Sequence, residues 1–260
     1  MDEKEDEKEK EKKEGEVDRG DVTGKGGVGA MRLPSLRCAP LLEEKDSLLD
    51  ERLRRRLAEI GTLRRLPAGT PLQEEGEKAV SILNLVEGIV ATYRLSDEGE
   101  RRILSFHFPG DLIGLLEKGR YVNSARALTP IVAYVFPTAA FLRFLGEHPG
   151  VEEAFLAKAH QDLREAEQHA LMLARREAHE RLLLLLDLLR KRLPVKEGEG
   201  GAVVLDLPLR RADIADYLGL SVEAVSRAFG RLEEEGYLRL LTPRRVELLP
   251  LSKERVAALA

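Results

Sequence analysis

The stretch from 219 to 232, GLSVEAVSRAFGRL, places an acid, a hydroxyl and a guanidinium at helical spacing. Glu223 and Arg227 are four residues apart with Ser226 between them, so the three share one side of a predicted helix. Arginine pairs with guanine through two hydrogen bonds, glutamate accepts from cytosine, and serine contacts several base edges. The face therefore predicts base reading in the DNA major groove. The alternative is an ordinary intrahelical Glu–Arg pair on a solvated surface.

The surrounding residues favour base reading, because Arg211 to Gly230 fits a helix-turn-helix. Gly219 lies where the turn needs a left-handed residue, and Ser221 follows as the cap of the second helix. The segment GYLRLLTPRRVELLP then predicts two short strands around a turn, which is a wing. The expected buried positions of the motif are Ile214, Ala215, Leu218, Leu220, Val225 and Ala228. Candidates for contacts to the DNA backbone are Arg210, Arg211, Ser221, Arg244 and Arg245.

A long helix is predicted from 151 to 176, which contains no glycine or proline after Val151. Its apolar residues recur at alternating spacings of three and four, the pattern of a close-packed coiled-coil seam. This pattern predicts a homodimer, and the alternative is a helix packed on its own domain. The seam consists of Leu156, Ala159, Leu163, Ala166, Ala170 and Leu173.

The rest of the chain divides into segments that differ in composition and in the periodicity of their apolar residues. Residues 1–34 are rich in charge and poor in large apolar residues, which predicts a disordered tail. Residues 35–60 have helical periodicity, and 62 to about 140 alternate short apolar segments with turn signals, as in a small antiparallel barrel or roll. The expected domains are the tail at 1–34, a sensor roll at 35–150, a dimerisation helix at 151–176 and a DNA-binding domain at 177–260.

Composition limits the other possibilities. The chain has 260 residues and one cysteine, which excludes a disulfide framework within a subunit and fits a cytoplasmic protein. No apolar run approaches the roughly 20 residues needed to span a bilayer, so no membrane association is expected. No Ser-His-Asp, Cys-His or paired-carboxylate constellation is visible, so no enzyme is predicted. An architectural DNA-binding dimer stays open as an alternative to a regulator.

The segment RADIADYLGLSVEAVSRAFGRLEEEGYL resembles the DNA-binding part of the CRP/FNR family of bacterial transcription regulators. The resemblance covers about 35–260 and includes GERRILSFHFPGDLIGL, NSARALT and ARREAHERL. It implies an α+β fold with an N-terminal cyclic-nucleotide-binding-type β-roll, a long dimerisation helix and a C-terminal winged helix-turn-helix. It also implies double-stranded DNA, a second copy of the chain and RNA polymerase as partners.

Glu223, Ser226 and Arg227 follow the E-x-x-S-R pattern of the FNR and FixK branch. The pattern implies a TTGA-N6-TCAA-like palindrome and control of microaerobic, anaerobic or nitrogen-oxide-responsive genes. Members of the separate cyclic-AMP-receptor branch instead have an R-E-x-x-G-R pattern, with an arginine where Val222 stands here.

The residues that would bind an effector are missing from the positions where the family places them. The family's ribose acid and phosphate arginine match Leu115 and Asn123, so no cyclic nucleotide is expected. Cys38 alone cannot hold a [4Fe–4S] cluster, and it is interpreted as a packing residue or a redox-sensitive thiol. No metal site and no cofactor are predicted, with haem ligation as the alternative.

Overall fold

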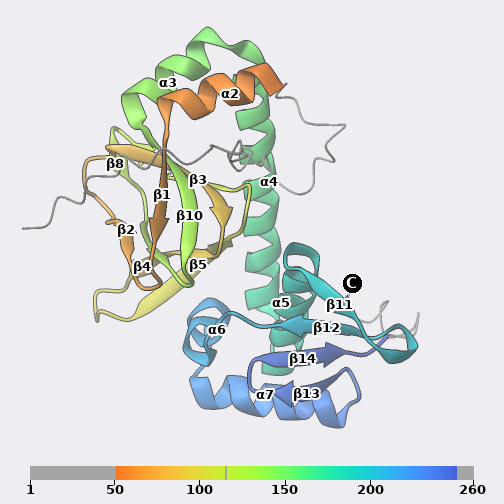
Figure 1. Ribbon diagram of the computed structural model, residues 1–260. Helices are drawn as coiled ribbons and strands as arrows, with labels where there is room; N and C mark the ends of the chain where they lie inside the picture. The colour runs from red at the N-terminus through yellow and green to blue at the C-terminus, as the bar shows by residue number, and fades with distance from the viewer. Residues whose placement is uncertain (1–50, 115, 251–260) are drawn as a thin grey trace, which may run out of the picture. The chain divides into compact units, whose positions relative to one another are not determined.

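The computed structural model describes residues 51–114 and 116–250, all within a compact unit that spans 34–260 (Figure 1). The predicted tail at 1–34, the first part of the predicted helix at 35–60, Cys38 and Leu115 lie outside the described residues. Within the described part, no helix is long and apolar enough to cross a membrane.

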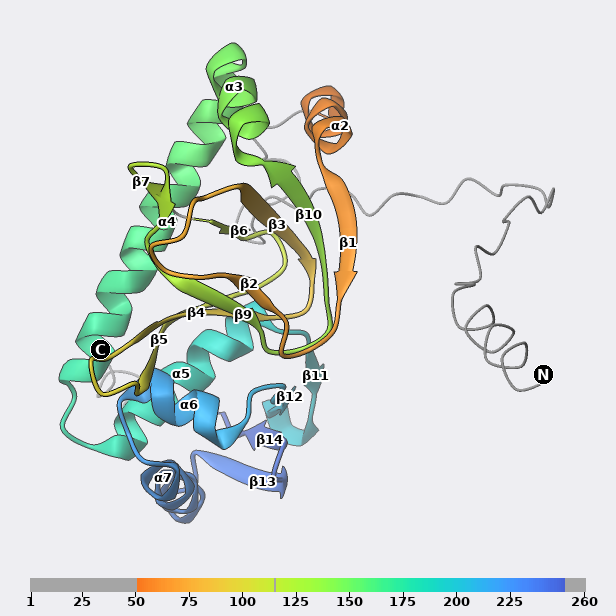
Figure 2. The same cartoon turned by 90° about the vertical axis from the view of Figure 1, so that its left-hand side faces the viewer.

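Two antiparallel sheets form the roll (Figure 2). One sheet has the order β1-β10-β3-β6, the other has β2-β9-β4-β5, and β7 pairs with β8. The strands are β1 Thr62–Leu66, β2 Pro71–Gln73, β3 Ser81–Glu87, β4 Val90–Leu95, β5 Arg101–His107, β6 Leu112–Ile113, β7 Leu116–Glu117, β8 Arg120–Tyr121, β9 Ser124–Ala127 and β10 Ile131–Pro137.

Strand alternation explains how the first sheet packs on both faces. In β10, Ile131 and Ala133 point into the roll and meet Val90 and Ala125 of the second sheet in one apolar cluster. The intervening residues of β10 point outward and pack against helices α2 (Glu51–Ile60) and α3 (Thr138–Glu147). The turn between β3 and β4 requires Gly88, whose φ is +88° and whose added Cβ would lie 2.3 Å from the Pro130 carbonyl oxygen.

Within the described residues, three helices accompany the roll. α2 spans Glu51–Ile60, α3 spans Thr138–Glu147 and α4 spans Pro149–Ala174. Proline at the first position of α4 favours helix initiation because its fixed φ matches the helix and its missing N–H would be unpaired there anyway. The long helix therefore begins and ends two residues earlier than the predicted 151–176.

The C-terminal elements form a winged helix-turn-helix (Figure 1). A four-stranded sheet of order β11-β12-β14-β13 packs with the helices around an apolar cluster that includes Leu186, Leu205 and Phe229. The elements are α5 Ala178–Arg192, β11 Val195–Glu197, the short 3-10 turn η1 Glu199–Gly201, β12 Val203–Asp206, α6 Arg211–Leu218, α7 Val222–Glu234, β13 Leu238–Thr242 and β14 Arg245–Leu248.

The α+β fold with a roll, a long helix and a winged helix-turn-helix is confirmed. One difference concerns KEGEGG, which the sequence presents as a glycine-rich link. The structure instead folds 195–206 into the β11–β12 hairpin and adds it to the wing sheet through β12 and β14. Because β11 is only three exposed residues, its sequence carries no apolar alternation to reveal it.

Candidate nucleic-acid interface

The helix-turn-helix is built around the turn between α6 and α7. Gly219 adopts φ 63° and ψ 41° and caps α6, and the Leu220 N–H then donates to the Ala215 carbonyl at 3.0 Å. A residue with a side chain would be strained in this left-handed conformation. The predicted interior positions Ile214, Ala215, Leu218, Val225 and Ala228 are buried, and Leu220 is partly buried against them.

Ser221 begins α7. Its Oγ accepts a hydrogen bond of 3.1 Å from the Ala224 N–H, as a capping serine does. The Glu223 carboxylate accepts hydrogen bonds from its own backbone N–H and from the Ser221 hydroxyl, and these bonds, with a smaller attraction from the charge of Arg227, lower its pKa. Glu223 is therefore a carboxylate at neutral pH, which is the form that accepts hydrogen bonds from a base.

The other side of α7 is open to solvent. Glu223, Ser226 and Arg227 are all exposed, whereas Val225 and Phe229 face the interior. The Ser226 hydroxyl donates to the Val222 carbonyl at 3.0 Å, which leaves its oxygen able to accept. Within the described residues, Arg227 makes no ion pair, so the intrahelical Glu223–Arg227 bridge of an ordinary solvated face does not form.

The candidate backbone-contact residues at the start of α6 differ from each other. The Arg210 guanidinium is exposed and donates to Asp213 at 2.9 and 3.1 Å. The Arg211 guanidinium instead lies 3.5 Å from the centre of the Phe229 ring, and burial lowers its pKa. This placement departs from the phosphate-contact prediction for Arg211, because its charge is turned into the motif rather than toward a ligand.

The wing places two arginines at its tip. Arg244 and Arg245 lie at and after the turn between β13 and β14, and both are exposed. Arg245 donates to Asp206 of β12 at 2.6 Å, while the Arg244 backbone N–H donates to the Thr242 hydroxyl at 3.2 Å. The tip therefore holds the Arg244 backbone in place and leaves its side chain in solvent.

The predicted seam of α4 is exposed along its whole length. Leu156 and Leu163 are 53% and 59% exposed, although leucine at such a density is usually covered. The residues that pack on the same chain lie on another face and include Val151, His169 and Met172. The seam members Leu156, Ala159, Leu163, Ala166, Ala170 and Leu173 are all exposed in the single chain.

Asn123, which matches the family's phosphate position, belongs to a partly exposed polar network around Arg94. Arg94 donates to the Asn123 side-chain oxygen at 3.1 Å and to the Val122 carbonyl at 2.9 Å, and it pairs with Glu75 at 3.2 Å. The Asn123 carbonyl accepts from Gln73 at 2.7 Å. A phosphate here would face the Glu75 carboxylate and a guanidinium that is already bonded.

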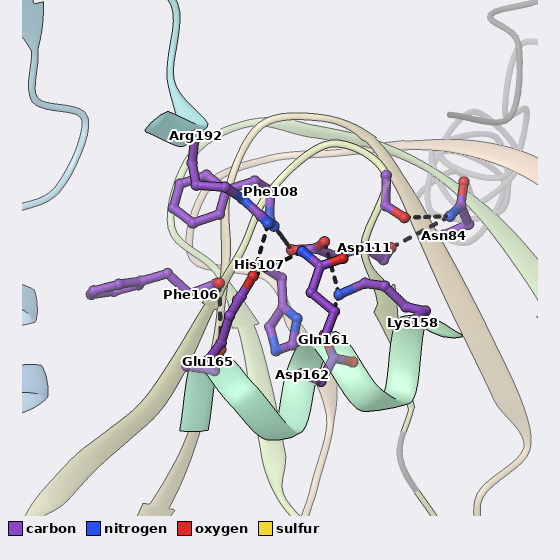
Figure 3. Close-up of polar contacts among 12 residues, drawn as sticks. Asn84, Phe106, His107, Phe108, Asp111, Lys158, Gln161, Asp162, Glu165 and Arg192 are labelled. Carbon is purple, nitrogen blue, oxygen red and sulfur yellow. Dashed lines mark hydrogen bonds and ion pairs between the residues drawn. The ribbon is translucent and has the colours of Figure 1, made fainter. Parts of the chain in front are cut away.

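A second polar cluster joins the roll to α4 and α5 (Figure 3). Lys158 of α4 and Arg192 of α5 converge on the buried Asp111 carboxylate at 3.3 and 2.5 Å. Burial alone would raise the pKa of Asp111, but the cations and the Phe108 N–H lower it below its usual value. Arg192 also pairs with Glu165 of α4 at 3.0 Å. The sequence carried no signal for these contacts between distant residues.

His107 lies in the same cluster, and its Nε2 shares a hydrogen bond of 3.1 Å with the Thr92 hydroxyl. Burial lowers its pKa to about 4, and the attraction of Asp111 does not offset the effect. The imidazole is therefore neutral at physiological pH. No group of three or more His, Cys, Asp or Glu side chains that could hold a metal ion occurs among the described residues.

Comparisons with known proteins agree with this geometry. A model of the cyclic nucleotide-binding domain matches 63–148, and a model of the Crp-like helix-turn-helix domain matches 180–259. The nitrogen fixation regulation protein FixK of Bradyrhizobium diazoefficiens is 35% identical over 219 residues, which cover 82% of this chain and 92% of the relative. The chain belongs to the CRP/FNR family.

This CRP/FNR family member is a DNA-binding transcription regulator of the FNR/FixK-like branch. The transcriptional activatory protein AadR of Rhodopseudomonas palustris is 37% identical over 68% of this chain and 77% of the relative. The solved structure of FixK2 from Bradyrhizobium japonicum superposes with a TM-score of 0.68 at 30% identity, over 77% of this chain and 97% of that one.

Proposed function

We propose that this regulator is a homodimer that binds a TTGA-N6-TCAA-like palindrome in double-stranded DNA. The observation that carries the proposal is the open face of α7, where Glu223, Ser226 and Arg227 are exposed together. Arg227 is assigned to the guanine of TTGA and Glu223 to the opposing cytosine, which are the partners that each side chain prefers. Ser226 is assigned to a neighbouring base edge.

The exposed seam of α4 supports a two-fold dimer. The seam runs from 156 to 173, and these 18 residues of α4 span about 27 Å, so it offers a long row of apolar side chains to a second copy. Burying leucines that are half exposed in the single chain is favourable at about 25 cal/mol per Å² of apolar surface. Small alanines between the leucines let two such helices approach closely.

The geometry of the palindrome is consistent with such a dimer. Two four-base half-sites separated by six bases have centres about 10 base pairs apart, which is one turn of DNA. The two recognition helices of a two-fold dimer then meet the same face of the duplex. Arg210, Ser221, Arg244 and Arg245 are assigned to the DNA backbone, where they fix the register without selecting the sequence.

The proposed regulator binds its site without an added effector. The network around Arg94 and Asn123 supports this for cyclic nucleotides, and the single cysteine of the chain supports it for an iron–sulfur cluster. Control then rests mainly on how much of the protein is made. We assign it no catalytic activity, and we place it in the cytoplasm with RNA polymerase as a partner.

The proposed target genes respond to low oxygen or nitrogen oxides. Similarity to nitrogen fixation regulation proteins and to the anaerobic regulatory protein of Haemophilus influenzae supports the low-oxygen part of the proposal. The nitrogen-oxide part rests on the E-x-x-S-R pattern of Glu223, Ser226 and Arg227. AadR is a transcriptional activatory protein, and we extend activation of transcription to this chain as part of the proposal.

The test is DNA binding by protein purified in air without cyclic nucleotide, haem or iron. We expect one footprint on the TTGA-N6-TCAA palindrome and much weaker binding when the G·C pair is changed. Sequence-independent protection would instead favour an architectural protein. A large gain in affinity with cyclic AMP, or binding only after haem or iron is supplied, would overturn the effector-free proposal. Cys38→Ser is expected to keep the affinity within about a factor of ten, or roughly 1.4 kcal/mol.

A further inference from the structure

Arg101 of the sensor roll is bonded to the first helix of the DNA-binding motif. Its guanidinium donates to Asp216 at 2.7 Å and to Asp213 at 2.6 Å, although these aspartates lie more than a hundred residues later in the chain. The side chain of Asp213 is 2% exposed and those of Arg101 and Asp216 are 22% and 27% exposed. Partly buried, two-pronged ion pairs of this kind are stronger and more specific in geometry than surface pairs.

An aromatic contact lies next to this ion pair. Phe106 of β5 and His169 of α4 both pack on Tyr217 of α6, with ring centroids 4.6 and 3.9 Å away. His169 Nε2 also lies 2.8 Å from the Tyr217 carbonyl oxygen, where it donates a hydrogen bond. Tyr217 is 4% exposed. Strand β5, helix α4 and helix α6 therefore meet at one side chain, and Figure 2 shows β5 and α6 side by side.

This contact leaves the recognition face uncovered. Asp213, Asp216 and Tyr217 belong to α6, whereas the exposed Glu223 and Arg227 belong to α7. The roll therefore holds the DNA-binding motif without covering the side chains that would meet the bases. The arrangement is one in which DNA can bind, not one that occludes the motif.

Asp213 also links Arg101 to Arg210. Its carboxylate accepts from the guanidinium of Arg210, the proposed phosphate contact, as well as from Arg101. If Arg101 is removed, Asp213 and Asp216 lose the guanidinium that they share. Among the described residues, Asp213 then pairs with Arg210 alone. The negative charge left beside Arg210 would weaken its attraction to a phosphate.

From these contacts we propose that Arg101 is a positioning residue that sets the distance between the two recognition helices of the dimer. The proposal rests on the proposed function, because it requires a dimer joined through α4 and a palindromic site. α4 carries the seam at one face and contacts Tyr217 of α6 through His169. When α6 is fixed, α7 of the second subunit lies near its half-site once the first subunit has bound, so its effective concentration there is high if the spacing is right. When α6 is loose, this advantage is lost.

The experiment compares Arg101→Ala with Arg102→Ala on palindromes whose spacers run from five to eight bases. Arg102 is the matched control, since it is the next residue of β5 and pairs only with exposed Glu100 among the described residues. We expect Arg101→Ala to lose about tenfold in affinity for the six-base spacer and to discriminate less among spacers. Arg102→Ala should match the unaltered protein in both respects.

An isolated TTGA half-site separates a positioning role from damage to the motif. Arg101→Ala should lose much less affinity for the half-site than for the palindrome, because the α7 face is unchanged and only the Arg210 contact is weakened. An equal loss on half-site and palindrome would overturn the proposal, as would unchanged spacing preference or tighter binding to the palindrome. If the unaltered protein does not prefer the palindrome at all, the proposed function fails instead.

Asp216→Asn provides a second and milder variant. It removes one of the charges that Arg101 bonds and leaves Asp213, which also bonds the α6 N-terminus, in place. We expect a smaller loss in the same direction, and we expect the double variant with Arg101→Ala to be no worse than Arg101→Ala alone. Fully additive losses in the double variant would contradict a shared contact.

Discussion

At the residue scale, sequence specificity depends on whether an exposed arginine is free to meet a base. Arg227 is exposed and makes no ion pair within the described residues, whereas Arg211 is stacked on Phe229. The two arginines belong to the same motif and share the same chemistry, yet packing commits one of them to the interior. A basic residue near a recognition helix is therefore a DNA contact only if the fold leaves its guanidinium outside.

Replacing Arg227 by alanine should lower affinity for the palindrome by about 1–3 kcal/mol and relax the preference for guanine in TTGA. The cause is the loss of two hydrogen bonds to the O6 and N7 of that guanine. Fluorescence anisotropy on duplexes that differ only at this G·C pair measures both effects. Arg210→Ala is the comparison, because a lost phosphate contact should weaken all sequences alike and flatten the salt dependence. Full retention of the G·C preference in Arg227→Ala would show that another residue reads this base.

At the element scale, how much could be predicted from the sequence depends on whether a signal is local. The exposed seam of α4 and the buried side of α7 follow from helical periodicity, and the turn at Gly219 follows from its need for a left-handed residue. The β11–β12 hairpin has no such pattern. The pairing of Arg101 with Asp213 and of Asp111 with Arg192 depends on tertiary packing between residues far apart in the chain, which periodicity does not encode.

Replacing Leu163 by glutamate should convert the proposed dimer into monomers. Leu163 is 59% exposed in the single chain, so the change leaves the core intact and places two facing acids in the apolar seam. Analytical ultracentrifugation measures the association state, and binding to the palindrome should fall because the half-sites are no longer linked. Gln168→Glu, also exposed on α4 but outside the seam, is the control and should remain dimeric. An intact Leu163→Glu dimer would place the interface elsewhere.

At the scale of the whole molecule, a polar cluster joins the roll to α4 and α5. Asp111 is buried between Lys158 and Arg192, whose side chains are 10% and 5% exposed. Removing one partner from such a cluster leaves buried charge uncompensated, which is far more destabilising than losing a surface pair. The cluster ties the roll to α4, which bears the proposed seam, and to α5, which packs on α7 of the DNA-binding motif, so its protonation affects the stability of the whole fold.

Acidification should destabilise the protein, with His107 as one cause. Its pKa is about 4 in the folded protein, below its ordinary value of 6.5, so the unfolded chain binds more protons between these values. Its contribution to stability is therefore present above pH 6.5 and is lost as the pH falls toward 4, by up to about 3 kcal/mol. His169, whose pKa is also lowered by burial, acts in the same direction. The pKa of Asp111 lies below its ordinary 3.8, so the stability that this carboxylate contributes is lost at lower pH.

His107→Gln isolates this contribution, because glutamine keeps a hydrogen-bonding group for Thr92 but does not titrate. Urea unfolding at several pH values between 4 and 7 measures the free energy of unfolding. We expect the curve for His107→Gln to fall less steeply with decreasing pH than that of the unaltered protein. His160→Gln, at an exposed position of α4, is the matched control and should keep the original steepness. Parallel curves for His107→Gln and the unaltered protein would mean that His107 is protonated to the same extent in the folded and unfolded chains, and that the acid sensitivity arises from other groups.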